Sequence, residues 1–306
     1  MTGAEVNKAA NGWLDGLIGV LIFSGSLPAT RIAVTGLEPV FLTALRAAIA
    51  GTLALGLLLA FRAKRPDREH LGPLLVVALG VVVGFPLLTA LALRHVTSAH
   101  AIVFTGLLPL ATATFGVLRG GERPRPAFWL FSALGSLLVA GFALTQGLAA
   151  APVGDALMLA AIILCGLGYA EGGRLSRTLG GPQVISWALV LSLPVMLPLA
   201  LLLRPPSFAD VGLPAWLGLG YVSVFSMLVG FVFWYRGLAR GGVAAVGQLQ
   251  LLQPFFGLAL AAAILHEPVT PLMLAVTVAV IFCVAGARRF SSPGQGAEPK
   301  TVPQSG

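Results

Sequence analysis

Three glutamine side chains lie within one strongly apolar stretch of the chain, residues 243–265. An amide in a hydrocarbon environment is costly unless it faces protein or water. Gln250 and Gln253 share one helical face with Gly257 by i, i+3, i+7 spacing, whereas Gln248 points elsewhere. These amides could form a hydrogen-bonding cavity wall, or they could join neighbouring helices. We favour the cavity wall.

Two prolines, Pro109 and Pro254, interrupt apolar stretches at equivalent places. A proline inside a helix removes one backbone hydrogen bond and displaces the carbonyl four residues earlier. These carbonyls belong to Thr105 and Gln250, and in a membrane they must meet protein or water. Each proline is either a hinge beside a substrate-facing acceptor or a plain kink, and their paired occurrence favours the hinge slightly.

Formal charge is rare inside the apolar stretches. Arg46 is the only charged residue deep within one of them, and a lone buried cation needs a partner. It could recognise a substrate carboxylate, but we favour a structural pair with helix-end carbonyls or with an acid such as Glu38. Glu122 and Glu267 lie at stretch ends, where we expect them to hold loops or to pair with neighbouring arginines.

Further polar and aromatic side chains could complete a cavity, although each alone is more often a packing or interface residue. The candidates are Ser24, Thr89, His100, Tyr169, Ser226 and Trp234. None of the acids is placed convincingly at mid-membrane. Glu171 could carry a coupling proton, but an ion pair with Arg174 at i+3 is the preferred interpretation.

The sequence contains no set of residues whose types and spacing are typical of a catalytic site. Cys165 and Cys283 lie inside apolar stretches, and no Cys/His cluster has metal-ligand spacing. The phosphate-binding motif of nucleotide-driven pumps is missing too. We therefore expect no catalytic residues, no metal and no cofactor. An intramembrane enzyme and a passive channel are the alternatives to a carrier.

The elements that position these residues are apolar helices. Hydrophobic residues make up 57% of the 306 and charged residues 10%, against roughly 25% charged in an average soluble domain. Ten stretches have about the length that crosses a bilayer. They cover residues 13–34, 39–61, 71–92, 97–118, 127–147, 154–173, 183–203, 213–235, 243–265 and 270–287. The partners are thus a lipid bilayer and a small-molecule substrate.

The basic residues predict the orientation of the chain. The net charge is +8, yet the lysines and arginines sit in short gaps between apolar stretches, so membrane topology explains them better than nucleic acid does. If successive gaps lie on opposite sides of the membrane, 15 of the 19 lysines and arginines fall on one side and three fall on the other. Both termini are therefore predicted in the cytoplasm, and the chain in a bacterial-type plasma membrane.

The two halves of the chain resemble one another. At an offset of 145 residues, Pro109 matches Pro254 and Glu122 matches Glu267. Five helices per half is an odd number, so the second copy must enter the membrane from the opposite side. We expect an all-α membrane protein with two inverted five-helix repeats, residues 1–148 and 149–290, followed by a disordered cytoplasmic tail, 291–306.

These marks resemble the EamA-type branch of the drug/metabolite transporter superfamily. The resemblance rests on Pro109 to Glu122, Pro254 to Glu267 and the Pro39 to Arg46 pattern, and it covers about residues 13–288. It implies a central cavity surrounded by helices 1, 3, 4, 6, 8 and 9. One departure stands out, because the position expected to match Arg46 in the second half is Leu189.

The predicted function is secondary transport by alternating access, with export of amino acids or other small metabolites. Two inverted halves supply such a mechanism, with the substrate site between them. The sequence leaves open the substrate, the direction of transport, coupling to a proton or another ion, and assembly as a homodimer.

Overall fold

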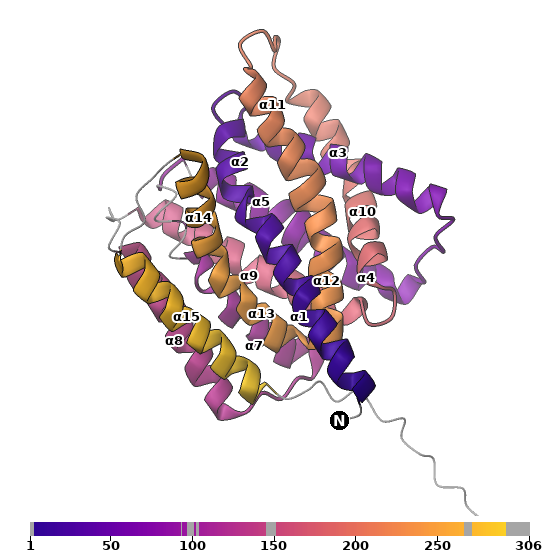
Figure 1. The fold of residues 1–306 in the computed structure, drawn as a ribbon. Helices are drawn as coiled ribbons and strands as arrows, with labels where there is room; N and C mark the ends of the chain where they lie inside the picture. The colour runs from indigo at the N-terminus through magenta and orange to yellow at the C-terminus, as the bar shows by residue number, and fades with distance from the viewer. Residues whose placement is uncertain are drawn as a thin grey trace, which may run out of the picture.

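The computed structural model of the chain describes residues 3–92, 94–96, 101, 104–144, 151–265 and 271–291. All regular secondary structure in these ranges is helical, as expected. The helices form one bundle, in which the first and last parts of the chain lie side by side (Figure 1). Two candidate residues, His100 and Glu267, and the tail beyond Ser291 lie outside the described residues.

The first half of the chain gives helical segments over the predicted stretches, several of them interrupted. The segments are α1 (Gly3–Ser24), α2 (Ser26–Ala33), α3 (Pro39–Ala60), α4 (Arg68–Val77), the π-helical η1 (Ala78–Gly84), α5 (Phe85–Ala92), α7 (Leu108–Gly120) and α8 (Pro126–Leu144). Proline at the first turn of α3 and α7 suits a helix start, where the backbone N–H has no helical partner.

The second half follows the same order. Its segments are α9 (Pro152–Leu175), α10 (Gly181–Leu202), α11 (Leu213–Gly220), the π-helical η2 (Tyr221–Val229), α12 (Gly230–Gly241), α13 (Val243–Gly247), the 3-10 helix η3 (Gln248–Leu252), α14 (Gln253–Leu265) and α15 (Pro271–Phe290). The helical run that begins at Leu213 continues to Gly241, beyond the residue 235 predicted from apolarity.

Within the described ranges, six helical runs are long and apolar enough to cross a bilayer. They are Asn11–Ala33, Pro39–Ala60, Arg68–Ala92, Pro152–Leu175, Gly181–Leu202 and Leu213–Gly241, and a shorter apolar helix covers Pro126–Phe142. Large apolar side chains such as Leu137, Leu202 and Phe282 point outward and are 68%, 82% and 70% exposed. Such a surface requires lipid, so the chain is a multi-pass membrane protein.

The two halves interleave. α1 packs along α12, α3 along α10, α7 along α9 and α8 along α15, so every one of these pairs joins the first half to the second. Figure 1 shows the α8–α15 pair on one flank of the bundle, with α1 and α12 crossing its front. A shared core therefore holds the halves together, and each half needs the other to bury its inner faces.

The α1–α12 contact brings two backbones unusually close. A methyl group built at Gly237 would lie 2.7 Å from the backbone nitrogen of Gly16 and 2.9 Å from the carbonyl oxygen of Gly12. No side-chain rotation can relieve a clash with backbone atoms. Small residues at such a seam let membrane helices pack through van der Waals contact.

We predict that Gly237→Ala lowers the stability of the protein by about 1–3 kcal/mol, the usual cost of overpacking. Thermal unfolding of the purified protein in detergent, followed by tryptophan fluorescence, measures the effect. Gly56→Ala in α3 is the matched control, since a methyl group there meets nothing within 4 Å. Equal melting temperatures for the two variants would contradict the backbone contact.

Candidate functional site

A cavity lies between the two halves of the bundle. It encloses about 840 Å³ of empty space, counting the part that opens to solvent. Among the described residues, eighteen line it: Phe23, Ser26, Thr30, Arg46, Val81, Phe85, Pro86, Thr89, Ala90, Thr105, Leu108, Cys165, Tyr169, Ser226, Phe231, Gln250, Gln253 and Pro254.

The lining comes from both halves of the chain. The helices that the resemblance implied all contribute: α1–α2, η1–α5, the segment around α7, α9, η2–α12 and η3–α14. One further helix takes part, because α3 contributes Arg46. The resemblance placed this second helix outside the ring, although recognition of a substrate carboxylate by Arg46 was one of the two interpretations of the sequence.

The helices are irregular where they border the cavity. In both halves the third helix contains a π-helical segment, η1 before Pro86 and η2 before Gly230. Pro86 lacks the N–H that would bond the carbonyl of Val82, which accounts for the wider turn of η1. The sequence of η2 contains no proline, and we have no comparable account of it. Such π-helical turns often occur at functional sites.

The two predicted proline positions also coincide with helix breaks. A turn at Gly106 and Leu107 separates Thr105 from α7, in which Pro109 occupies the first turn. In the second half the 3-10 helix η3 ends directly before Gln253 and Pro254. Thr105, Gln250 and Pro254 line the cavity, whereas Pro109 is buried behind the wall.

Several polar groups of the wall have no hydrogen-bond partner among the described residues. The side-chain nitrogen and oxygen of Gln250 are both buried and unpartnered, and so is the Thr89 hydroxyl. Gln253 donates a weak hydrogen bond to the Phe23 carbonyl at 3.4 Å. Because an unpaired buried polar group costs free energy, these groups suit binding of a polar solute or water.

Hydrogen bonds between side-chain hydroxyls and their partners also connect the two halves at the wall. The Ser26 hydroxyl donates to the hydroxyl of Ser226 at 2.7 Å. Close by, Tyr221 donates to the Ile22 carbonyl at 2.7 Å, at the point where the helix breaks between α1 and α2. Both hydrogen bonds join the first helix of one half to the third helix of the other.

The structure places most of the predicted cavity residues on one wall. Gln250, Gln253, Thr105, Thr89, Tyr169 and Ser226 line it together. Ser24 does not, because its hydroxyl turns back to the Val20 carbonyl at 2.7 Å. Trp234 does not either, since its ring is fully buried beneath the wall. Gln248 is buried away from the cavity, as its position on the helix predicted.

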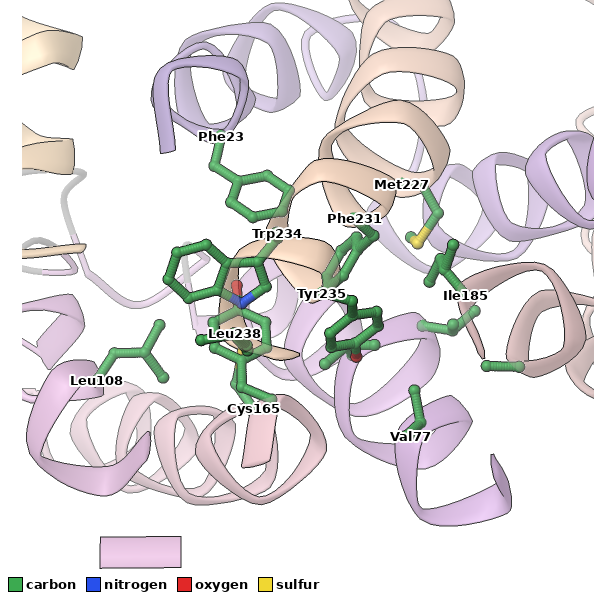
Figure 2. Close-up of a cluster of buried hydrophobic side chains, with 14 of the residues drawn as sticks. Phe23, Val77, Leu108, Cys165, Ile185, Met227, Phe231, Trp234, Tyr235 and Leu238 are labelled. Atoms are coloured by element: carbon green, nitrogen blue, oxygen red, sulfur yellow. The ribbon is translucent and has the colours of Figure 1, made fainter. Parts of the chain in front are cut away.

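Aromatic rings line part of the cavity, which we call the aromatic floor, and Figure 2 shows two of these rings, Phe23 and Phe231, beside Trp234 and Tyr235. Phe23, Tyr169 and Phe231 line it, and the Phe23 and Phe231 ring centroids are 4.9 Å apart. Trp234 packs under Tyr169 at 5.3 Å, and Tyr235 packs under Phe231 at the same distance. Sequence reasoning missed Phe23 and Phe231, because single phenylalanines in apolar helices carry no distinguishing signal.

Arg46 is the one charged side chain on the described wall. It is 8% exposed, and its Nε atom is buried without a hydrogen-bond partner. The favoured pairing with Glu38 is not seen, because that carboxylate accepts a hydrogen bond from the Phe41 N–H at the start of α3. None of the ion pairs among the described residues includes Arg46.

Below the aromatic floor, Glu122 ties the two halves together. Its carboxylate accepts hydrogen bonds from the backbone N–H groups of Val243 and Ala244, both at 2.7 Å, and it pairs with Arg177 at 2.9 Å. A carboxylate at the first turn of a helix satisfies free N–H groups and complements the helix dipole. The arginine that forms this printed ion pair with Glu122 comes from the other half of the chain.

Two further ion-pair clusters lie at the same end of the bundle. Glu171 is fully buried and pairs with Arg174, as the sequence favoured, and also with Arg119 at 3.0 Å. Asp15 pairs with Arg240 at 2.8 Å. Each cluster joins a residue of the first half to a residue of the second. We call the three clusters together the ion-pair layer.

One group of potential metal ligands occurs away from the cavity. Asp67, Glu69 and His70 offer ligand atoms within 4.8 Å of one another at the start of α4. The two acids are exposed, and acidic residues at a helix N-terminus are explained by the helix dipole. This group therefore gives no argument for a metal.

Comparisons with known proteins agree with the fold and the repeat. The EamA-like transporter family model matches the chain twice, over residues 11–144 and 152–288. An uncharacterized transporter of Bacillus subtilis (strain 168), YdeK, is 71% identical over 286 residues, which are 94% of this chain and 100% of the relative. A solved crystal structure with 22% identity covers 90% of this chain and 97% of its own length with a TM-score of 0.74, so it shares the fold.

The matches cover nearly the whole chain, and they confirm the resemblance seen in the sequence. The apolar exterior and the interleaved helices agree with a protein that works inside a bilayer. The chain belongs to the EamA-like transporter family and is a multi-pass membrane transporter.

Proposed function

We propose that the protein is a secondary transporter that exports amino acids or other small metabolites by alternating access. The observation that carries the proposal is one cavity, lined by both halves of the chain and covered at one end by the aromatic floor and the ion-pair layer. A site of this kind holds a solute in contact with both halves, so a relative movement of the halves changes its access.

We further propose that ten membrane-spanning helices form two inverted five-helix repeats, residues 1–148 and 149–290. Three features support the repeat: the family model matches twice, π-helical segments recur at η1 and η2, and helix breaks recur before Pro109 and Pro254. Features that recur at matched places are expected from one unit used twice.

The arginine-rich ends of the helices support a placement of the ion-pair layer at the cytoplasmic face of the plasma membrane. Arg119, Arg174, Arg177 and Arg240 all contribute to this layer. The cavity then lies on the outer side of the layer, so the structure corresponds to a state closed toward the cytoplasm. Export requires a second state, in which the layer opens.

The chemistry of the wall favours binding over catalysis. It presents Arg46, hydroxyls and amides, and the described part of the wall carries no carboxylate or imidazole that could act as a base. An intramembrane enzyme needs a nucleophile paired with such a base. A passive channel is equally unsupported, since a channel usually carries a ring of like charges along its path, and the described lining has Arg46 as its one charged side chain.

Counterflow in proteoliposomes tests the proposed function. Vesicles are loaded with an unlabelled amino acid mixture, and the uptake of the same labelled amino acids is followed over time. A carrier gives transient, saturable accumulation. A flux that rises linearly with concentration would instead indicate a channel, and chemical conversion of the solute would indicate an enzyme.

We predict that Gln253→Leu lowers the rate of counterflow roughly 5- to 10-fold without lowering expression, because one hydrogen bond to a polar solute is worth about 1–1.5 kcal/mol. Gln248→Leu in the adjoining 3-10 helix η3 is the matched control, since Gln248 is fully buried but does not line the cavity. Normal kinetics for Gln253→Leu would remove this residue from the site.

We also predict that Glu122→Gln favours the state open to the cytoplasm. The substitution removes the charge that pairs with Arg177 and holds the N–H groups of Val243 and Ala244. Charged hydrogen bonds are worth about 1.5–3 kcal/mol, enough to shift a two-state equilibrium about tenfold or more.

A cysteine introduced at Thr30 on the cavity wall, with both native cysteines replaced by alanine, reports this shift. A membrane-impermeant thiol reagent added outside should label it several-fold more slowly when Glu122→Gln is present. Arg125→Gln, an exposed charge in the same loop, is the control and should leave labelling unchanged. An unaltered rate in the Glu122 variant would show that this carboxylate does not hold the gate.

A further inference from the structure

We propose that Arg46 binds the anionic group of the transported solute, so that the cavity selects small organic molecules with one carboxylate and an apolar body. The inference rests on the proposed transport function and assigns the substrate class of the same cavity. Arg46 lies seven residues into α3 and therefore about 10 Å along the helix from its first residue.

The guanidinium group lacks a counter-charge among the described residues. Each buried acid is already engaged: Asp15, Glu122 and Glu171 belong to the ion-pair layer. Glu38, the nearest acid along the chain, caps α3 through the Phe41 N–H. A cation that is 92% buried and unpaired destabilises a membrane protein, so it persists where function requires it.

The fold itself does not require a cation at this place. The position expected to match Arg46 in the second half is Leu189, which is fully buried in the core of α10. Around Arg46, the alanines Ala44, Ala47 and Ala50 pack completely into the same interior. An apolar side chain would thus satisfy the packing of α3, and the positive charge serves the cavity instead.

The remainder of the wall defines what accompanies the anion. Phe23, Tyr169 and Phe231 offer an aromatic floor for an apolar body. The unpartnered oxygens of Gln250 and Thr89 can accept hydrogen bonds from an amino group. The described wall has no carboxylate that could neutralise the ammonium group of a solute that lacks its own acid group. Carboxylates and zwitterions therefore fit, whereas amines without an acid group are repelled by Arg46.

Ligand-induced stabilisation of the purified protein tests the assignment without any transport step. The probes form two matched series, one aromatic and one aliphatic: L-phenylalanine, 3-phenylpropionate and L-phenylalaninamide, and L-leucine, 4-methylpentanoate and L-leucinamide. Sodium phosphate and sodium chloride serve as inorganic anions. Each probe is titrated while the melting temperature is followed in detergent, and binding to the folded state alone raises it.

We expect the carboxylate members of at least one series to raise the melting temperature of the wild type and to bind about 10-fold or more tightly than the matched amide. Arg46→Met should abolish this difference, and Arg46→Lys should retain part of it. Because an unpaired buried charge is removed, Arg46→Met should also melt at the same temperature as the unliganded wild type or above it.

Arg204→Met is the control, because Arg204 is exposed, packs over the Phe208 ring and does not line the cavity. It should leave both the melting temperature and the response to carboxylates unchanged. If Arg46→Met lowered the melting temperature below that of the unliganded wild type, Arg46 would have a structural role and the proposal would fail.

Three other results would overturn the inference: equal binding of the amides, an unchanged response in Arg46→Met, or no stabilisation by any organic probe. Stabilisation by phosphate or chloride alone would assign Arg46 to inorganic anions and also contradict it. A failure of the proposed transport function is distinguishable, because the binding pattern would then persist while counterflow was absent.

Discussion

A polar group inside the hydrocarbon layer has no water to bind, so it must find a partner within the protein or face an enclosed cavity. Many polar groups of the described helices follow this constraint, whereas Gln248 of η3 and Ser132 and Ser136 of α8 are buried without a hydrogen-bond partner and away from the cavity lining. Regular helices satisfy their own backbone, and the described π-helical segments η1 and η2, together with the breaks before Pro109 and Pro254, all occur beside the cavity. The same constraint explains why the unpartnered Gln250 amide faces the cavity rather than lipid.

The end of the bundle that carries the ion-pair layer holds several contacts between the two halves. The Phe23–Phe231 ring contact, the close approach of Gly16 and Gly237, and the ion pairs themselves all join the first half to the second. Arg177 and Arg240 of this layer remain about one-third exposed, so solvent screens their pairs with Glu122 and Asp15. Contacts of modest strength across two halves are suited to a gate that must both form and break.

Arg46 and Trp234 show how far residue types alone could lead. A polar or amphipathic side chain in an apolar helix needs an explanation, and the sequence favoured the cavity for Trp234 and a structural pair for Arg46. The structure places Trp234 under the floor, where Tyr169 covers it, and places Arg46 on the wall. Helical position alone could not separate these outcomes, since lipid-crossing helices are apolar nearly all round and carry no periodic signal for their inner face.

The sequence by itself determined the membrane class, the helical stretches, the basic side of the bundle and the family. These follow from composition, segment length and local motifs such as Pro109 to Glu122, which neighbouring residues encode. Only the tertiary structure decided that α3 reaches the cavity, that Glu122 caps α13, and that Phe23 and Phe231 form the floor. These contacts join residues more than a hundred positions apart, so they depend on how the helices rotate and pack.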